Sequence, residues 1–315
     1  MFRCVKWPAS LASSPRFSKF ESSLLKTGKG VFAMLNSYSV VFRLAALAAV
    51  GSLHPAFTQH VAPINRSSSV SFYSVSELTK PRVAQPSLRG ARLADPKDWP
   101  ASFYSVHPGG SCTSTLVGPR SLLTAAHCTP NDSIVTIRWA GKIYTGRCTR
   151  SELYSAAAPD KDWAMCLMES DVPVPRYETI NSEGSRITLD SELLLTGFGC
   201  TQSDGAGGND GNYRIGEAKV INLPSTDNND IVTSSEVALC FGDSGGGAFL
   251  FLDRAKTKRI QVSVNSRVEA NGEVLGPHSY LASLSTPAAQ AFLRRWAKEN
   301  VATICGLNMN ASSCR

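Results

Sequence analysis

The stretch Cys240-Phe241-Gly242-Asp243-Ser244-Gly245-Gly246-Gly247 sets one hydroxyl between glycines, directly after a carboxylate. Glycine tolerates backbone angles that other residues avoid, so this stretch can turn sharply and point main-chain N–H groups inward. Acyl transfer needs such donors, because its tetrahedral intermediate places negative charge on the former carbonyl oxygen. Ser244 is therefore a candidate nucleophile, and the N–H groups of Gly242 and Ser244 are candidates for an oxyanion hole. Taken alone, a glycine-rich turn that contains serine is more often an ordinary loop.

A serine nucleophile requires a general base and a group that orients the base, and two upstream segments supply candidates for both. Leu122-Leu123-Thr124-Ala125-Ala126-His127-Cys128 places a histidine at the end of an apolar run. Asp162-Trp163-Ala164-Met165-Cys166-Leu167 begins another apolar run with a carboxylate, and Asp160 is the alternative two residues earlier. An isolated histidine of this kind is usually a core residue. The order His, Asp, Ser along the chain therefore carries the interpretation.

Together the three segments resemble the trypsin/chymotrypsin-like serine peptidases. The hallmarks of that family are Thr-Ala-Ala-His-Cys, an Asp before an apolar strand, and Gly-Asp-Ser-Gly-Gly, in this order. The resemblance runs from about Trp99 to about Trp296. It implies an all-β fold of two six-stranded antiparallel β-barrels with the active site between them, plus a C-terminal helix. It also implies a triad of His127, Asp162 and Ser244, with Asp162 preferred because the expected apolar run follows it.

Length and composition fit this interpretation. The 315 residues can hold one large or two modest domains, and 43% apolar residues suffice for a core. The formal charge of +7 is uneven: residues 1–59 carry seven Lys and Arg against one acid, so the remainder is near +1. We therefore expect no nucleic-acid partner. From residue 99 onward, short apolar runs alternate with Gly, Pro, Asp and Asn, which is typical of an all-β domain.

The chain divides into a presequence, a connecting segment and one catalytic domain. Residues 1–58 indicate a presequence, because residues 40–53 fit the apolar part of a signal peptide and are too short for a membrane span. Met34 would place that run near the start of translation, and an uncleaved anchor is the alternative. We expect a secreted or periplasmic protein, favour a monomer, and expect no stable membrane span. The expected boundaries are 59–92 for a pro-segment or linker and 93–300 for the peptidase domain (barrels at about 93–185 and 186–285, helix 286–299), followed by a disulfide-bonded tail at 301–315.

The resemblance breaks at the activation segment. The family is usually cut before Ile-Val-Gly-Gly, so that the new α-ammonium pairs with the Asp before the nucleophile, here Asp243. This sequence has no Ile-Val-Gly-Gly, and cleavage after Arg89 or Arg92 would expose Gly90 or Leu93. A buried carboxylate without a counter-charge is costly. The favoured function is a serine endopeptidase acting on protein or peptide substrates; the alternative is a peptidase-fold binding or regulatory protein in a zymogen-like, inactive state.

The family's primary pocket provides the expectations on specificity. Ala238, followed by Leu239, stands where trypsin-type enzymes carry an Asp to hold Lys or Arg, so a cationic side chain would lack a partner. Ser263 and Asn265 are assigned to the wall strand, with Asn265 narrowing the mouth. His278 stands where a glycine is usual, and is a plug that favours small P1 residues, a partner for acidic ones, or a surface residue. We expect cleavage after small, apolar or acidic residues, and not after Lys or Arg.

Cysteine usage indicates an oxidising compartment. Nine cysteines are present, and an even eight remain if Cys4 leaves with the presequence. Counting alone leaves the connectivity open. Metal ligation is the rival interpretation, but Cys-x-x-Cys and His-x-x-His spacings are absent. Residues 203–212 offer possible calcium ligands without the regular spacing of a calcium loop, so we expect no metal and no cofactor. The resemblance implies Cys112–Cys128, and we suggest Cys200–Cys240, Cys148–Cys166 and Cys305–Cys314 for the rest.

Overall fold

The computed structural model describes residues 69–74, 88–107, 110–202, 204–205, 210–271 and 274–315. All of them belong to one compact unit. The presequence expected over residues 1–58, with Met34, lies outside the described residues. Within the described part of the chain, no helix combines the length and the apolar composition that crossing a membrane would need.

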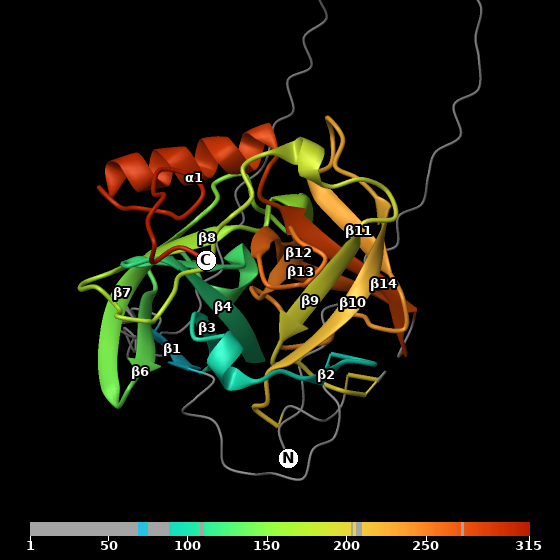
Figure 1. Ribbon diagram of the computed structural model, residues 1–315, viewed down its shortest axis with the longest axis horizontal. Helices are drawn as coiled ribbons and strands as arrows, with labels where there is room; N and C mark the ends of the chain where they lie inside the picture. The colour runs from blue at the N-terminus through green and yellow to red at the C-terminus, as the bar shows by residue number, and fades with distance from the viewer. Residues whose placement is uncertain (1–68, 75–87, 108–109, 203, 206–209, 272–273) are drawn as a thin grey trace, which may run out of the picture. The chain divides into compact units, whose positions relative to one another are not determined.

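The first barrel is closed and contains seven strands, in the order β1-β3-β4-β5-β8-β7-β6 (Figure 1). The expectation of six strands is wrong for this barrel, because β1 inserts between β3, which it pairs antiparallel, and β6, which it pairs parallel. Val70 and Phe72 of β1 are buried in the barrel core. Residues 69–74 therefore belong to the barrel and not to a linker. The strands are β1 (Ser69–Ser74), β3 (Ser102–His107), β4 (Gly110–Gly118), β5 (Ser121–Thr124), β6 (Ile134–Trp139), β7 (Lys142–Arg150) and β8 (Ala164–Met168).

The second barrel has the six expected strands, in the order β11-β14-β13-β12-β9-β10, and closes through pairing of β10 with β11 (Figure 1). The two-residue strand β2 (Arg92–Leu93) pairs with the beginning of β10, where β11 does not reach. The two-barrel, all-β fold is thus confirmed. The strands are β9 (Glu192–Gly197), β10 (Arg214–Asn222), β11 (Asp230–Ser234), β12 (Gly247–Phe251), β13 (Arg259–Asn271) and β14 (Val274–Ser283).

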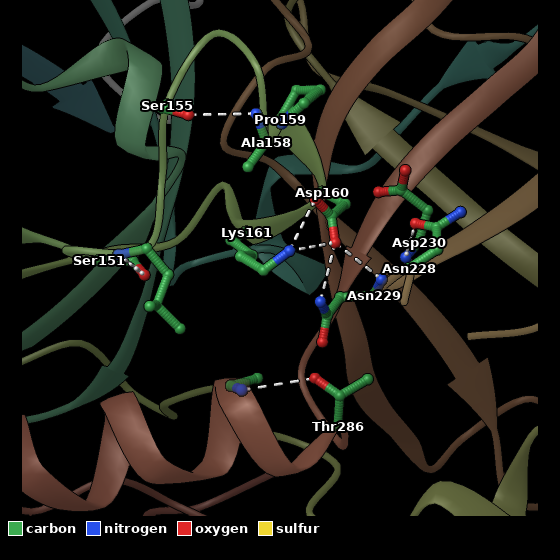
Figure 2. A network of polar contacts seen from close by, with 12 residues as sticks. Ser151, Ser155, Ala158, Pro159, Asp160, Lys161, Asn228, Asn229, Asp230 and Thr286 are labelled. Atoms are coloured by element: carbon green, nitrogen blue, oxygen red, sulfur yellow. Dashed lines mark hydrogen bonds and ion pairs between the residues drawn. The ribbon is translucent and has the colours of Figure 1, made fainter. Parts of the chain in front are cut away.

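One α-helix, α1 (Pro287–Glu299), follows the barrels, together with four short 3-10 helices elsewhere in the described chain. The Thr286 hydroxyl (Figure 2) caps α1 by accepting a hydrogen bond from the N–H of Ala289. Pro287 occupies the first turn of α1. The apolar face of α1 packs into a cluster that includes Trp163 of the first barrel and Val264 of the second. The 3-10 helices are η2 (Pro96–Asp98), η3 (Ala126–Cys128), η4 (Pro159–Lys161) and η5 (Gly184–Arg186).

Four disulfides cross-link the described chain, and they are the four pairs suggested by the sequence. The Cys112–Cys128 bond ties β4 to the 3-10 helix η3, and the Cys200–Cys240 bond ties the segment after β9 to the loop before β12. Disulfides persist in oxidising compartments, so this set indicates an extracellular or secreted protein. The other two pairs are Cys148–Cys166 and Cys305–Cys314.

Candidate active site

His127 and Asp162 meet because the strands beside them pair. Strand β5 runs antiparallel to β8, so Thr124 lies opposite Ala164, just before the histidine and just after the carboxylate. The Nδ1 atom of His127 is 2.6 Å from Oδ2 of Asp162, and the main-chain N–H of His127 donates to Oδ1 at 2.9 Å. The side chain of Asp162 is 1% exposed and that of His127 is 34% exposed. With Nδ1 engaged, Nε2 is the ring atom left to act on a substrate.

The pair shifts the protonation equilibrium of the imidazole. Burial disfavours its charged form, but the negative charge of Asp162 and the hydrogen bond to it outweigh burial and raise the pKa of His127 above its ordinary value. A general base must be neutral to accept a proton. The arrangement can therefore supply a base at neutral to alkaline pH.

Asp160, the alternative carboxylate, has other partners (Figure 2). Its Oδ2 atom lies 2.8 Å from the ammonium of Lys161 and accepts hydrogen bonds from the main-chain N–H of Asn229 at 3.0 Å and from its amide at 2.8 Å. Burial acts to raise the pKa of Asp160, but Lys161 and Asn229 outweigh it and hold the pKa at about 2. The structure brings Asp162, and not Asp160, to His127.

Ser266 is a site residue that the sequence analysis missed. Its hydroxyl, on β13, donates to Oδ2 of Asp162 at 2.8 Å. The carboxylate of Asp162 is thereby oriented from both barrels, by His127 of the first and Ser266 of the second. Ser266 lies three residues after Ser263 on the same strand. The sequence alone did not show which of these two serines would reach the site.

The assignment of Ser263 and Asn265 to the pocket wall is contradicted. Both residues are fully buried. Ser263 lies opposite Ala248 and Ser283 inside the sheet, and Asn265 lies beneath the nucleophile loop. The strand runs on to Asn271, and its contact with the candidate triad comes from Ser266, after both of these residues.

The part of β13 after Ser266 borders the Cys200–Cys240 disulfide. Val268 packs against a small cluster formed by this disulfide and Leu275 of β14. Val268 and Leu275 are therefore apolar neighbours of the loop that carries Ser244, in positions that the sequence analysis did not assign.

Ala238, Leu239 and Ser279, which lie just before the nucleophile loop and on β14, are all fully or almost fully buried. The main-chain N–H of Leu239 donates to the hydroxyl of Ser279 at 2.9 Å. His278 precedes Ser279 on β14, and neighbouring strand residues face opposite sides. The Nδ1 atom of His278 lies 2.9 Å from the carboxylate of Glu269, with 37% of the His278 side chain exposed. Of the three alternatives for His278, the structure matches the surface residue.

The nucleophile loop lies between the two barrels. Thr113 of β4 donates from its N–H to the Ser244 carbonyl at 2.7 Å and from its hydroxyl to the Gly242 carbonyl at 2.9 Å. A Cβ atom on Gly245 would lie 2.2 Å from the hydroxyl of Thr124, and the φ of Gly245 is +82°, so this contact requires glycine. The loop thus packs on the segment that leads to His127. The hydroxyl of Ser244 makes no hydrogen bond to any described residue, His127 included; in substrate-free sites such bonds are often long.

Two peptide groups of the loop have their carbonyls fixed. The N–H of Cys200 donates to the carbonyl of Phe241 at 2.8 Å, and the N–H of Gly246 donates to that of Asp243 at 3.0 Å. In a trans peptide the C=O and the following N–H point in opposite directions. The N–H groups of Gly242 and Ser244 are therefore turned away from these partners, and neither donates a hydrogen bond to another described residue. Both donors remain available to a ligand.

Asp243 is fully buried, and the described hydrogen-bond partners of its carboxylate are main-chain donors. The N–H of Gly199 donates to Oδ1 and the N–H of Cys240 donates to Oδ2, both at 2.7 Å. Burial raises the pKa of Asp243 to about 7, against the weaker opposing effects of these two bonds and of the charge of Arg214. The carboxyl therefore titrates near neutral pH.

The uncut chain passes close to Asp243 at Leu88. Leu88 is fully buried and donates from its N–H to the carbonyl of Cys200 at 3.1 Å, one residue from Gly199. Arg89 follows, pairing with Ala238 as an isolated bridge.

Arg89 and Arg92, after which cleavage was expected, both make contacts away from Asp243. The guanidinium of Arg89 donates to the carbonyls of Leu275, at 2.8 Å, and Gly276. Arg92 and Leu93 form β2. Leu88, and not Gly90 or Leu93, thus lies beside the Asp243 loop.

Comparisons with known proteins agree with this fold. The family described as Trypsin matches residues 89–276. Among solved structures, a double mutant of human heparin binding protein (CAP37) matches with a TM-score of 0.53 and 15% identity, over 67% of this chain and 97% of that one. At this identity the likeness shows the fold alone. Comparison of the sequence with curated proteins gives no match. Since the family match spans more than half of the 315 residues, the chain belongs to the trypsin family.

Proposed function

We propose that the protein is a serine endopeptidase that uses Ser244 as nucleophile, His127 as base and Asp162 to orient the base. The observation that carries this proposal is the paired His127 and Asp162 next to a loop with two unengaged N–H groups. A structural histidine would not need a buried carboxylate with three hydrogen-bond donors, two from His127 and one from Ser266.

The residues suit an acyl-enzyme mechanism. Ser244 attacks the substrate carbonyl carbon while neutral His127 accepts its proton at Nε2. Asp162 fixes the tautomer and stabilises the imidazolium, and the N–H groups of Gly242 and Ser244 stabilise the oxyanion. His127 then donates the proton to the leaving amine. Water repeats the cycle on the acyl-enzyme and completes hydrolysis of the peptide bond.

For the substrate we propose a small residue at P1. The region beside Ser244 offers a floor of Ala238 and Ser279, and Val268 with Leu275 supplies apolar bulk beside the Cys200–Cys240 disulfide. None of these side chains carries a charge that could pair with Lys or Arg. Glu269 already pairs with His278, which argues against an acidic P1 residue. Peptide p-nitroanilides with Ala, Val, Phe, Glu and Lys at P1 test this, with Ala or Val expected to give the highest kcat/KM.

The test of the activity is labelling with a fluorophosphonate probe, with the adduct located by mass spectrometry. We expect labelling of Ser244 in the unmodified protein and none in the matched control Ser244→Ala. Replacing His127 with alanine should lower turnover by a factor on the order of 10⁶, as for the same chemistry on the unrelated subtilisin fold. No labelling of a folded protein would contradict the active-peptidase proposal.

A zymogen-like state is the second candidate, and Asp243 is the observation that favours it. Its carboxyl is fully buried, burial raises its pKa to about 7, and its described hydrogen-bond donors are the main-chain N–H groups of Gly199 and Cys240. A cut before Leu88 would create an α-ammonium beside the loop that holds Asp243. N-terminal sequencing of the labelled protein separates the candidates: labelling only of chains that begin at Leu88 would identify a zymogen, and labelling of longer chains would argue against one.

A further inference from the structure

Asn265 lies in β13 directly beneath the nucleophile loop. Its main chain binds that loop twice, donating to the carbonyl of Gly246 and accepting from the N–H of Gly245, both at 2.8 Å. Its side-chain amide donates to the carbonyl of Thr196 at 2.8 Å and to that of Asp243 at 3.3 Å. The residue is fully buried. Asn265 therefore joins the loop to β9 through a single amide group.

The carbonyl of Asp243 belongs to the peptide group whose N–H is that of Ser244. Because a peptide group is planar, holding its oxygen inward holds its N–H outward. The oxygen accepts two hydrogen bonds, from the N–H of Gly246 at 3.0 Å and from the amide of Asn265 at 3.3 Å. Rotation of this peptide would break both bonds and withdraw the Ser244 N–H from the oxyanion hole.

Among the described residues, the side-chain amide of Asn265 is hydrogen-bonded through its donor nitrogen only. Its amide nitrogen makes two hydrogen bonds, but its buried Oδ1 atom makes none to any described residue. A buried acceptor without a partner costs stability, and β-branched apolar residues suit a strand interior better. The donor side of the amide is thus the part that the surrounding structure uses.

We propose that Asn265 is a positioning residue for the oxyanion hole, acting through the Asp243–Ser244 peptide. This inference rests on the proposed peptidase function. It assigns Asn265 to the stabilisation of the transition state and not to binding of the substrate side chain, which the sequence had indicated.

The test compares Asn265→Ala and Asn265→Val with the matched control Asn181→Ala. Asn181 is also buried, and its amide also donates to a main-chain carbonyl, that of Glu183 at 2.9 Å, in the segment between the barrels. The Val variant removes the donor and keeps a residue that favours strands. For each protein, kcat and KM are measured on a small ester, and amide hydrogen exchange is followed by mass spectrometry in peptides covering residues 240–247.

We expect both Asn265 variants to lower kcat by roughly 10- to 100-fold with KM changed less than about threefold, since direct loss of one oxyanion donor costs about 10²- to 10³-fold. Exchange in the 240–247 peptides should rise in the Asn265 variants and stay unchanged in Asn181→Ala. Unchanged kcat and exchange, or equal losses in all three variants, would overturn the proposal. If the unmodified protein has no activity, the peptidase proposal fails, and hydrogen exchange still decides whether Asn265 holds the loop.

Discussion

Ionisation of Asp243 should make the uncut protein less stable as the pH rises towards 7. The carboxyl is fully buried, its hydrogen bonds come from two main-chain N–H groups at 2.7 Å, and burial raises its pKa to about 7 from the ordinary value of 3.8. At pH values between these two pKa values, the Asp243 carboxyl is ionised in the unfolded chain and protonated in the folded chain. The folded state then binds more protons, so the free energy of unfolding falls with pH in this window and levels off above pH 7.

The magnitude follows from the size of the shift. One pKa unit corresponds to 1.36 kcal/mol, so a shift of about three units gives about 4 kcal/mol over the full window. Between pH 5 and pH 7 the expected loss is about 2 kcal/mol, because the folded carboxyl is only half ionised at pH 7. His127 also has a raised pKa in the folded protein, so its contribution is present below about pH 6.5 and is lost as pH rises through the folded value. The deprotonation of His127 therefore also lowers the free energy of unfolding as the pH rises, and it has to be separated from the effect of Asp243.

The assay is urea unfolding with disulfides intact, followed by tryptophan fluorescence at pH 5, 6, 7 and 8. Asp243→Asn is the matched control, because it preserves the shape and cannot ionise, while His127 contributes equally to both proteins. We expect the stability of the unmodified protein, relative to this variant, to fall by about 2 kcal/mol from pH 5 to pH 7. A difference that stays constant within about 0.5 kcal/mol would refute the reasoning. In a chain cut before Leu88, the new ammonium should remove most of this slope.

Three further expectations follow from single contacts. Ser266→Ala removes a donor from Asp162, so kcat should fall by about 10-fold with KM unchanged in steady-state kinetics, and unchanged kcat would contradict its assigned role. The raised pKa of His127 means that kcat/KM should rise with pH through a value above 6.5, as the imidazole loses its proton, and a pH–rate profile with its midpoint below 6.5 would disagree. Phe72→Ala should cost about 3–5 kcal/mol in chemical unfolding, because β1 is part of the core, whereas a loss below about 1 kcal/mol would indicate that β1 is dispensable.

The residues of the proposed triad could be named from the sequence because their chemistry is concentrated in local motifs. Ser244 lies among glycines that its turn requires, and His127 and Asp162 each adjoin a strand whose apolar run is visible. The choice between Asp160 and Asp162 followed from the same run. Each of these inferences depended on residues within a few positions of one another along the chain.

The pocket could not be predicted in the same way, because it depends on register. The pairing of β13 with β14 shifts between Asn265 and Arg267, and again between Val268 and Ala270. Side chains alternate between the two faces of a strand. Each register shift therefore changes which side chains of β13 face the candidate site. An alignment that ignores these irregularities places Asn265 at the mouth of a pocket, whereas the structure buries it under the nucleophile loop.

The strand β1 was missed for a different reason. Its alternation is visible in the sequence, with Val70 and Phe72 between serines, but it lies ahead of the expected cleavage region, where the resemblance implies a removable piece. In the structure β1 is hydrogen-bonded on both edges, to β3 and to β6, and fills part of the first core. Its loss would open the barrel between those strands and expose that core to water. A cut before Leu88 would therefore leave β1 bound to β3 and β6 without a peptide link to the rest of the domain, so β1 belongs to the folded domain whether or not the chain is processed.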